Sequence, residues 1–237
     1  MTATIVLVPG AWSGRWIWGP VEQALDARGV AYCSVDHPSI GATAAGNDVH
    51  DDARNVRTVV QEIGGPVVLV GNSYGGAVIS GASAGDTHVK RLVYLAAMMP
   101  NPDEPLLEHI AGATAPEFDA GITVDENGLL LMDREVELKT AFQQAAREMH
   151  DLVRANAGAP MSFGTDPTKA AFAEVGWKTI PSTYVVCTED HAITPEAQRD
   201  WATNRATEII EWTSDHCPQL SHPELVADLL EKLAREA

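Results

Sequence analysis

The pentapeptide Gly71-Asn72-Ser73-Tyr74-Gly75 contains residue types that suit nucleophilic catalysis. It follows the apolar run Val67 to Val70, which is typical of a buried parallel strand, and it leads into Gly75-Gly76-Ala77, where a helix can begin. A serine between a strand and a helix, flanked by glycines that permit a close crossing, is typical of a nucleophile elbow. The pentapeptide alone arises by chance in about one chain of this length in ten, so the flanking elements carry the interpretation.

A serine hydroxyl becomes a good nucleophile only when a neighbouring base takes its proton and a carboxylate orients that base. In a doubly wound sheet, the residues that follow the strands converge on one crevice. Asp190 follows a predicted strand over residues 183–187, and His216 follows a predicted strand over residues 206–212. The order Ser73, Asp190, His216 therefore predicts a catalytic triad.

Other histidines and acids are weaker candidates for the same roles. We expect His37 in a structural loop, His222 at the start of the last helix, and His191 too close to Asp190 in sequence to bridge it to the serine. The remaining histidines are expected to be solvated, and two acids stay as alternatives to Asp190: the histidines are His50, His88, His109 and His150, and the acids are Glu189 and Asp103.

A serine nucleophile also needs hydrogen-bond donors for the negative charge that develops on the substrate oxygen. The amide of Tyr74 directly follows the nucleophile at the predicted start of a helix, where amide groups point outward. Ala11 lies in the turn after the first predicted strand, at the same edge of the sheet. We therefore predict that the amides of Ala11 and Tyr74 form an oxyanion hole.

Apolar runs alternate with helical patterns along most of the chain, which predicts an α/β fold with a mostly parallel, six-stranded, doubly wound sheet. The predicted strands cover residues 4–8, 30–35, 67–70, 89–96, 183–187 and 206–212. We expect one domain, in which residues 1–99 and 179–237 form the core.

The alternation stops between residues 100 and 178, where prolines are frequent and the clearest pattern is a long helix near residues 134–156. We interpret 100–178 as a helical lid inserted into the core. Apolar residues of this segment, together with two residues of the core, are predicted to line a substrate pocket: Trp12, Leu106, Ile110, Leu130, Met132, Phe142, Met149 and Cys217.

The charge of the chain excludes some classes of partner. With 16 basic and 33 acidic residues, the formal net charge is -17, which repels nucleic acids and anionic lipid surfaces. The three cysteines are widely spaced, and they indicate neither a disulfide framework nor a metal site. The chain begins with a predicted core strand and has no apolar run of membrane-spanning length, so we expect a cytoplasmic enzyme without cofactor or metal.

The sequence resembles the α/β-hydrolase superfamily, in particular the branch with plant methyl-ester hydrolases of the methyl salicylate type and hydroxynitrile lyases. The matching pieces lie in both halves of the core: Val8 to Trp12, Trp16 and Trp18, Gly71 to Gly76, Val186 to Asp190 with Ile193, Gln198 and Arg199, and Ser214 to Ser221. The resemblance implies the same triad and the same oxyanion donors as those predicted above.

The chain differs from this branch at three positions in the predicted site. The lyases use a threonine in the first loop and a lysine directly after the triad histidine, whereas this chain has Gly10 and Cys217. Many members have a histidine where this chain has Pro9. We therefore predict hydrolysis of a small uncharged carboxylic ester through an acyl-enzyme. The alternatives are a lyase or a carbon-carbon bond hydrolase on the same scaffold, or a non-catalytic small-molecule receptor. For the oligomeric state, we expect a monomer or a homodimer.

Overall fold

Six parallel strands form the central sheet in the computed structural model, which describes residues 2–164 and 170–237. The strand order is β2-β1-β3-β4-β7-β8. Their bounds are β1 (Thr4–Val8), β2 (Tyr32–Ser34), β3 (Val67–Asn72), β4 (Val89–Leu95), β7 (Ser182–Cys187) and β8 (Glu208–Trp212). The predicted doubly wound α/β sheet is confirmed, and in this sheet all strand pairs are parallel.

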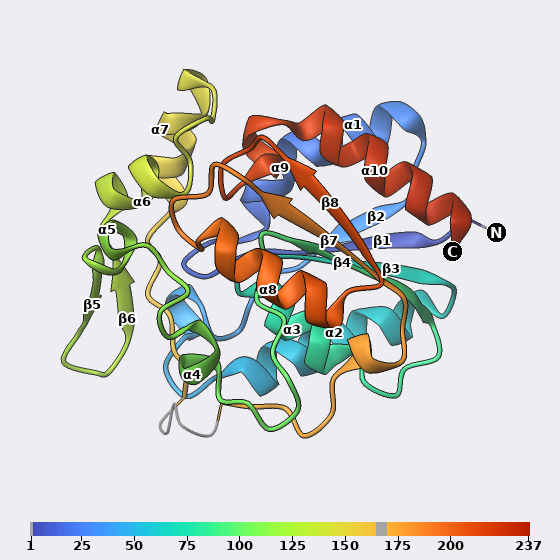
Figure 1. Cartoon of the computed structure of the whole chain (residues 1–237), viewed down its shortest axis with the longest axis horizontal. Coiled ribbons are helices and arrows are strands. Elements are labelled where there is room, and N and C mark those ends of the chain that lie inside the picture. The colour runs from blue at the N-terminus through green and yellow to red at the C-terminus, as the bar shows by residue number, and fades with distance from the viewer. Residues whose placement is uncertain (1, 165–169) are drawn as a thin grey trace.

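Helices cover both faces of the sheet (Figure 1). One face carries α1 (Gly19–Arg28), α9 (Pro218–Ser221) and α10 (Pro223–Glu236), and the other carries α2 (Val49–Ile63), α3 (Gly75–Ala82) and α8 (Pro195–Arg205). Sequence signals set the ends of these helices. The side chain of Asp48 accepts hydrogen bonds from the first turn of α2, and Gly64 ends that helix at φ 62°.

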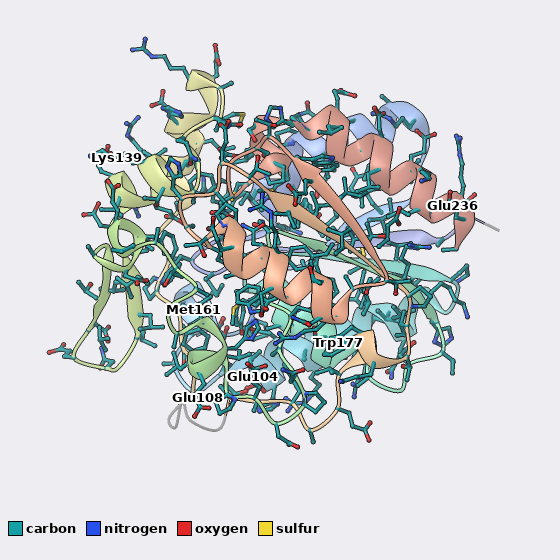
Figure 2. All side chains as sticks on the ribbon, in the orientation of Figure 1. Glu104, Glu108, Lys139, Met161, Trp177 and Glu236 are labelled. Atoms are coloured by element: carbon teal, nitrogen blue, oxygen red, sulfur yellow. The ribbon has the colours of Figure 1, made fainter. Side chains whose placement is uncertain are left out.

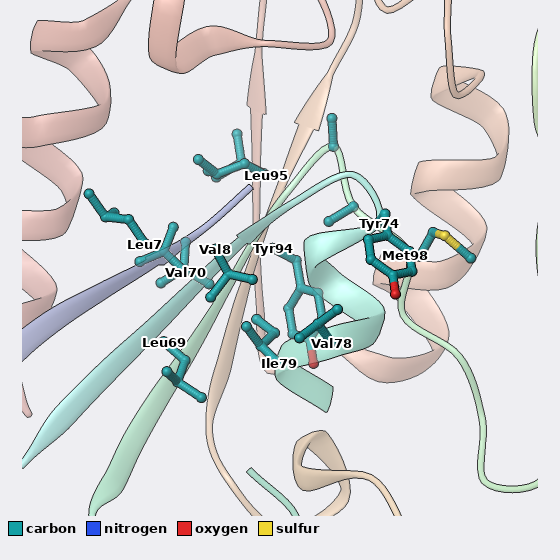
Figure 3. Close-up of a cluster of buried hydrophobic side chains, with 14 of the residues drawn as sticks. Leu7, Val8, Leu69, Val70, Tyr74, Val78, Ile79, Tyr94, Leu95 and Met98 are labelled. Atoms are coloured by element: carbon teal, nitrogen blue, oxygen red, sulfur yellow. The ribbon is translucent and has the colours of Figure 1, made fainter. Parts of the chain in front are cut away.

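The core lies between these layers because the central strands are apolar on both faces. Every residue of β3 is buried, and all residues of β1 except Thr4 are buried as well. Figure 3 shows side chains of the central strands on both faces of the sheet, with Leu7 and Leu95 on one face and Tyr94 beside Ile79 of α3 on the other. A continuous apolar run with no polar alternation is typical of such a strand.

The register of the sheet brings the carboxyl ends of the central strands together. Val8 at the end of β1 pairs with Gly71, and Asn72 at the end of β3 pairs with Leu95. On the other side, Leu95 pairs with Val185 near the end of β7. The loops that leave these strands therefore begin at one edge, which is where ligand sites form in this architecture.

Residues 100–178 lie between β4 and β7, and most of their elements are shown in green and yellow in Figure 1, on one side of the sheet. The segment contains α4 (Leu106–Ile110), α5 (Pro116–Asp119), the antiparallel pair β5 (Ile122–Val124) and β6 (Leu130–Met132), α6 (Arg134–Thr140), α7 (Arg147–Asn156) and a 3-10 turn (Gly176–Lys178). Residues 165–169 of the predicted lid lie outside the described residues. The expected helix over 134–156 is wrong as a single element, because residues 141–146 separate two shorter helices.

Met161, labelled in Figure 2, connects the β5–β6 hairpin to the rest of the molecule. Its backbone exchanges hydrogen bonds of 2.7 Å and 2.9 Å with Leu130, and it also forms a bridge with Ile40. The inserted segment is thus attached to the loop that follows β2. Among the described residues, no helix has the length and apolar character needed to cross a bilayer.

Candidate active site

Ser73 lies in a tight turn between β3 and α3 and has a φ of 54°, in the left-handed region. The glycines around it are required by space. A Cβ at Gly71 would lie 2.5 Å from the carbonyl oxygen of Gly75, and a Cβ at Gly75 would lie 2.6 Å from the carbonyl oxygens of Val8 and Pro9. Neither position can carry a larger residue without a backbone shift. The geometry is that of a nucleophile elbow.

His216 and Asp190 form a buried pair at the same edge of the sheet. The Nδ1 atom of His216 lies 2.6 Å from Oδ2 of Asp190, and both side chains are almost completely buried. The two residues come from the loops after β8 and β7, as the sequence predicted. A hydrogen bond between a carboxylate and Nδ1 leaves Nε2 of the imidazole free to act as a base.

Three further donors fix the carboxylate of Asp190. Its Oδ1 atom accepts hydrogen bonds from the amides of Ala192 at 2.7 Å and Ile193 at 3.0 Å. Its Oδ2 atom accepts a hydrogen bond of 2.7 Å from Nε2 of Gln198, whose Oε1 in turn accepts from the amide of Cys187 at 2.9 Å. Because these donors hold both oxygens, the carboxylate has one orientation toward His216.

Asn72, the residue before the nucleophile, joins the elbow to the loop that holds His216. Its Nδ2 atom donates hydrogen bonds of 3.0 Å to the carbonyl oxygens of Leu95 and His216. Its Oδ1 atom accepts a hydrogen bond of 2.9 Å from Gln219. Serine and histidine are thus positioned relative to each other by a buried amide between them.

The first loop lies directly against the elbow. A Cβ at Gly10 would be only 3.0 Å from Cβ of Ser73, so the backbone of this loop approaches the nucleophile closely. Ala11 follows Gly10 and lines both of the cavities beside Ser73, while Tyr74 occupies the N-cap position of α3. The two predicted oxyanion donors therefore lie on the two segments that border the serine.

Two cavities meet at Ser73. The smaller, of about 20 Å³, is lined by Ser73 and His216 together with Glu137 from α6. The larger, of about 170 Å³, is bordered mostly by apolar side chains, including Phe118, Ile122 and Phe163. Trp12 lines both cavities, and its Nε1 donates a 3.1 Å hydrogen bond to the carbonyl oxygen of Leu130.

Comparison with known proteins identifies the family. Residues 5–229 match the model of the alpha/beta hydrolase family, which covers nearly the whole chain. The chain belongs to the α/β-hydrolase family. The chain is 28% identical to an alpha/beta hydrolase of Aspergillus novofumigatus over 98% of this chain and 97% of the relative. It is also 28% identical to methylesterase 8 of Arabidopsis thaliana, over 99% of this chain and 90% of the relative.

A solved structure gives the same fold. The crystal structure of polyneuridine aldehyde esterase aligns with this hydrolase at a TM-score of 0.85 and 21% identity, covering 99% of this chain and all of that chain. At this level of identity the match describes the fold. The six-stranded core and the inserted segment are therefore both part of an architecture found in another α/β-hydrolase.

The structure divides the predicted pocket residues of this hydrolase into two groups. Five of them line a cavity: Trp12, Ile110, Leu130, Phe142 and Cys217. The other three, Leu106, Met132 and Met149, are not lining residues of either cavity and pack with the core cluster. In α4 the neighbouring Leu107, which is 41% exposed, borders the larger cavity while Leu106 turns into the core.

A buried network beneath the elbow of the hydrolase went unrecognised in the sequence. The carboxylate of Asp52 in α2 accepts a 2.7 Å hydrogen bond from the hydroxyl of Tyr74 and a 2.9 Å bond from the amide of Ser39. Burial, together with the nearby Asp52, raises the pKa of the Tyr74 hydroxyl, which therefore remains a donor. His37 lies in the same region, with Nε2 2.9 Å from the carbonyl oxygen of Pro9.

One histidine expected to be solvated is instead buried. His109 in α4 is 5% exposed and stacks on Trp201 with ring centroids 4.2 Å apart. Burial lowers its pKa to about 4, and its Nε2 atom accepts a 3.1 Å hydrogen bond from the amide of Met99. This neutral histidine has a structural role in the loop after β4.

Proposed function

We propose that this α/β-hydrolase is a serine esterase that cleaves small uncharged carboxylic esters through an acyl-enzyme. One observation carries the proposal. The strained turn places Ser73 at the wall of a cavity shared with His216, and the imidazole is held by Asp190 through a 2.6 Å contact. This combination supplies a nucleophile, a base and an orienting carboxylate.

Each residue has a defined role in the proposed reaction. Oγ of Ser73 attacks the ester carbonyl carbon while His216 takes the hydroxyl proton, and the amides of Ala11 and Tyr74 stabilise the oxyanion. Collapse of the tetrahedral intermediate breaks the bond to the alcohol, which leaves with the proton from His216. A water molecule, activated by the same histidine, then cleaves the acyl-serine ester.

The two cavities suggest where the parts of the ester lie. The larger cavity, of about 170 Å³ with mostly apolar walls, suits a hydrocarbon part of the ester. The cavity of about 20 Å³ beside His216 has room for only a small group. We infer that residues 100–178 form a lid, because Phe118, Leu130 and Phe163 of this segment supply walls of the larger cavity. The relatives named methylesterases are consistent with a small alcohol.

The decisive experiment is hydrolysis of a short-chain p-nitrophenyl ester by the wild type and by Ser73→Ala. The variant should lose about 10⁴-fold or more in kcat, because the triad acts as a unit. Circular dichroism of both proteins controls for folding. Equal rates in two folded proteins would refute the proposal, and tight ligand binding without turnover would then indicate a receptor.

A further inference from the structure

Glu137 is a buried acid in the wall of the smaller cavity that the proposed reaction does not use. It is 3% exposed and lies in α6, where its amide donates to the carbonyl oxygen of Asp133 at 2.9 Å. The side chain lines the same cavity as Ser73 and His216. A glutamate on a short helix with other acids is ordinarily exposed, so its burial beside the nucleophile is unusual.

The carboxyl group has an unsatisfied oxygen. Within residues 2–164 and 170–237, no group hydrogen-bonds to the buried Oε2 atom of Glu137. A buried polar atom without a partner costs about 1 to 3 kcal/mol, which a substrate group could recover by binding there. The other walls of this cavity include Trp12, Phe118 and Phe142, and the indole nitrogen of Trp12 already donates to Leu130. Glu137 is therefore a lining residue of this cavity with a buried side-chain oxygen that has no partner among the described residues.

The surroundings favour the neutral acid over the carboxylate. Burial raises the pKa of Glu137 to about 8, and the positive charge of Arg134, one turn earlier in α6, opposes this only in part. His216 and Cys217 from the loop after β8 line the same cavity. A neutral carboxylic acid carries one O–H donor.

Nearby negative charges also disfavour ionisation of Cys217, another residue in the wall of this cavity. Burial raises the pKa of the Cys217 thiol, and the negative charges of Asp215, Asp190 and Glu137 raise it further. Negative charges near Cys217, which lines this cavity, make a further negative charge at that side chain unfavourable. A proton on Glu137 leaves an O–H donor on a residue that lines the cavity.

We propose that the Glu137 carboxyl donates a hydrogen bond to an oxygen of the substrate that lies within a few bonds of the scissile carbonyl. Ser73 and Glu137 line the same cavity, which has a volume of only about 20 Å³. A substrate oxygen that reaches Glu137 must therefore lie close to the carbon that Ser73 attacks. The hydrolase would then prefer esters with an ether, hydroxyl or carbonyl oxygen next to the ester group. This inference rests on the proposed esterase function and adds the polar part of its substrate specificity.

Two isosteric esters test the preference. Methyl methoxyacetate and methyl butanoate differ only by an ether oxygen in place of one methylene group. Their dissociation constants are measured by NMR titration of Ser73→Ala, in which neither ester is turned over by the serine. They are also measured in Ser73→Ala carrying Glu137→Leu, Glu137→Gln or the control substitution Glu135→Gln. Glu135 lies on the same helix, and its side chain is 62% exposed.

Glu137→Leu should weaken binding of the methoxy ester by about tenfold and leave the butanoate within a factor of about two. Glu137→Gln should keep the preference, because a carboxamide also donates, and Glu135→Gln should change nothing. In the parent protein the preference should decline as the pH rises through about 8, since deprotonation removes the donor, and it should stay constant in Glu137→Gln.

Other outcomes would overturn the inference. Equal weakening of both esters by Glu137→Leu would indicate a structural role. Tight binding of the ammonium form of methyl 4-aminobutanoate that Glu137→Gln abolishes would indicate a carboxylate that binds cations. Because these are binding measurements on Ser73→Ala, they decide the role of Glu137 even where the wild type fails to hydrolyse esters, an outcome that would refute only the proposed function.

Discussion

Ser73, the proposed nucleophile, is held in an unfavourable backbone conformation by the residues around it. A left-handed φ in a residue other than glycine costs about 1 to 3 kcal/mol. Backbone hydrogen bonds hold the turn: the carbonyl oxygen of Ser73 accepts from the amides of Gly76 at 3.0 Å and Met98 at 2.9 Å. The strain is therefore maintained by the strand and helix around the serine.

Protonation of Glu137 should make the free energy of unfolding depend on pH. Its pKa is about 8 in the folded protein and 4.5 ordinarily, so the folded state binds the proton more tightly. The stability from this proton is complete below about pH 4.5 and is lost as the pH rises through about 8. Relative to Glu137→Gln, the wild type should lose on the order of a few kcal/mol between about pH 5 and about pH 8.

Urea unfolding of both proteins across this range measures the difference. The variant Glu135→Gln serves as the control, because its exposed side chain should leave the pH dependence of unfolding unchanged. If the wild type and Glu137→Gln keep a constant difference in free energy of unfolding from pH 5 to pH 8, Glu137 does not titrate in this way.

The sequence indicated the three residues of the proposed triad more clearly than the residues around them. Ser73, Asp190 and His216 could be assigned because each follows a strand and because parallel strands end at one edge. Glu137 gave no such signal, since a glutamate in a helical pattern normally faces solvent and only the packing of α6 shows otherwise. Asp52 was missed for the same reason, although it lies on the buried face of α2.

At the scale of elements, the crossing of β3 and α3 over the first loop depends on glycine. A Cβ at Gly75 would lie 2.6 Å from the carbonyl oxygens of Val8 and Pro9, which are backbone atoms that cannot move alone. We therefore expect Gly75→Ala to lower the free energy of unfolding by about 3 kcal/mol or more, or to prevent folding.

Gly19→Ala is the matched control for this substitution. Gly19 begins α1, has a φ of -46°, and a Cβ there would meet no atom within 4 Å outside its two chain neighbours. Because Pro20 follows and disfavours the helical backbone for a residue with a Cβ, we expect no gain in stability, and the change in free energy of unfolding should stay within about 1 kcal/mol. Thermal unfolding of both variants distinguishes steric conflict from a general effect of added side chains, and a Gly75→Ala protein as stable as Gly19→Ala would contradict the argument.

The strands and helices of the core could be predicted from the sequence, whereas those of the inserted segment could be predicted only in part. The helix expected over 134–156 is interrupted at residues 141–146, where polar groups form hydrogen bonds with residues outside the inserted segment. The amide of Gln144 donates to the carboxylate of Asp215 at 2.9 Å, and Nε2 of Gln143 donates to the carbonyl oxygen of Glu189 at 2.7 Å. No local pattern reports such contacts. The β5–β6 hairpin was detectable from its Asn127-Gly128 turn, but three-residue strands give little alternation.

The whole molecule is strongly acidic. It has 33 acidic and 16 basic residues, which give a formal net charge of -17. Such a charge lowers the local concentration of anions around the protein and slows their approach. The Debye length is about 30 Å at 0.01 M salt and about 10 Å at 0.1 M, so the effect acts over the whole protein only in dilute salt.

We therefore expect salt to favour an anionic ester over a neutral one. The ratio of kcat/KM for the methyl monoester of succinate to that for methyl pentanoate should rise several-fold between about 10 mM and about 300 mM sodium chloride. Contacts within the pocket also affect this ratio at any one salt concentration, but they are screened far less than long-range repulsion. Only the change with salt therefore reports the net charge, and a ratio that stays constant while the neutral ester is turned over would show that the charge of the surface does not control access to Ser73.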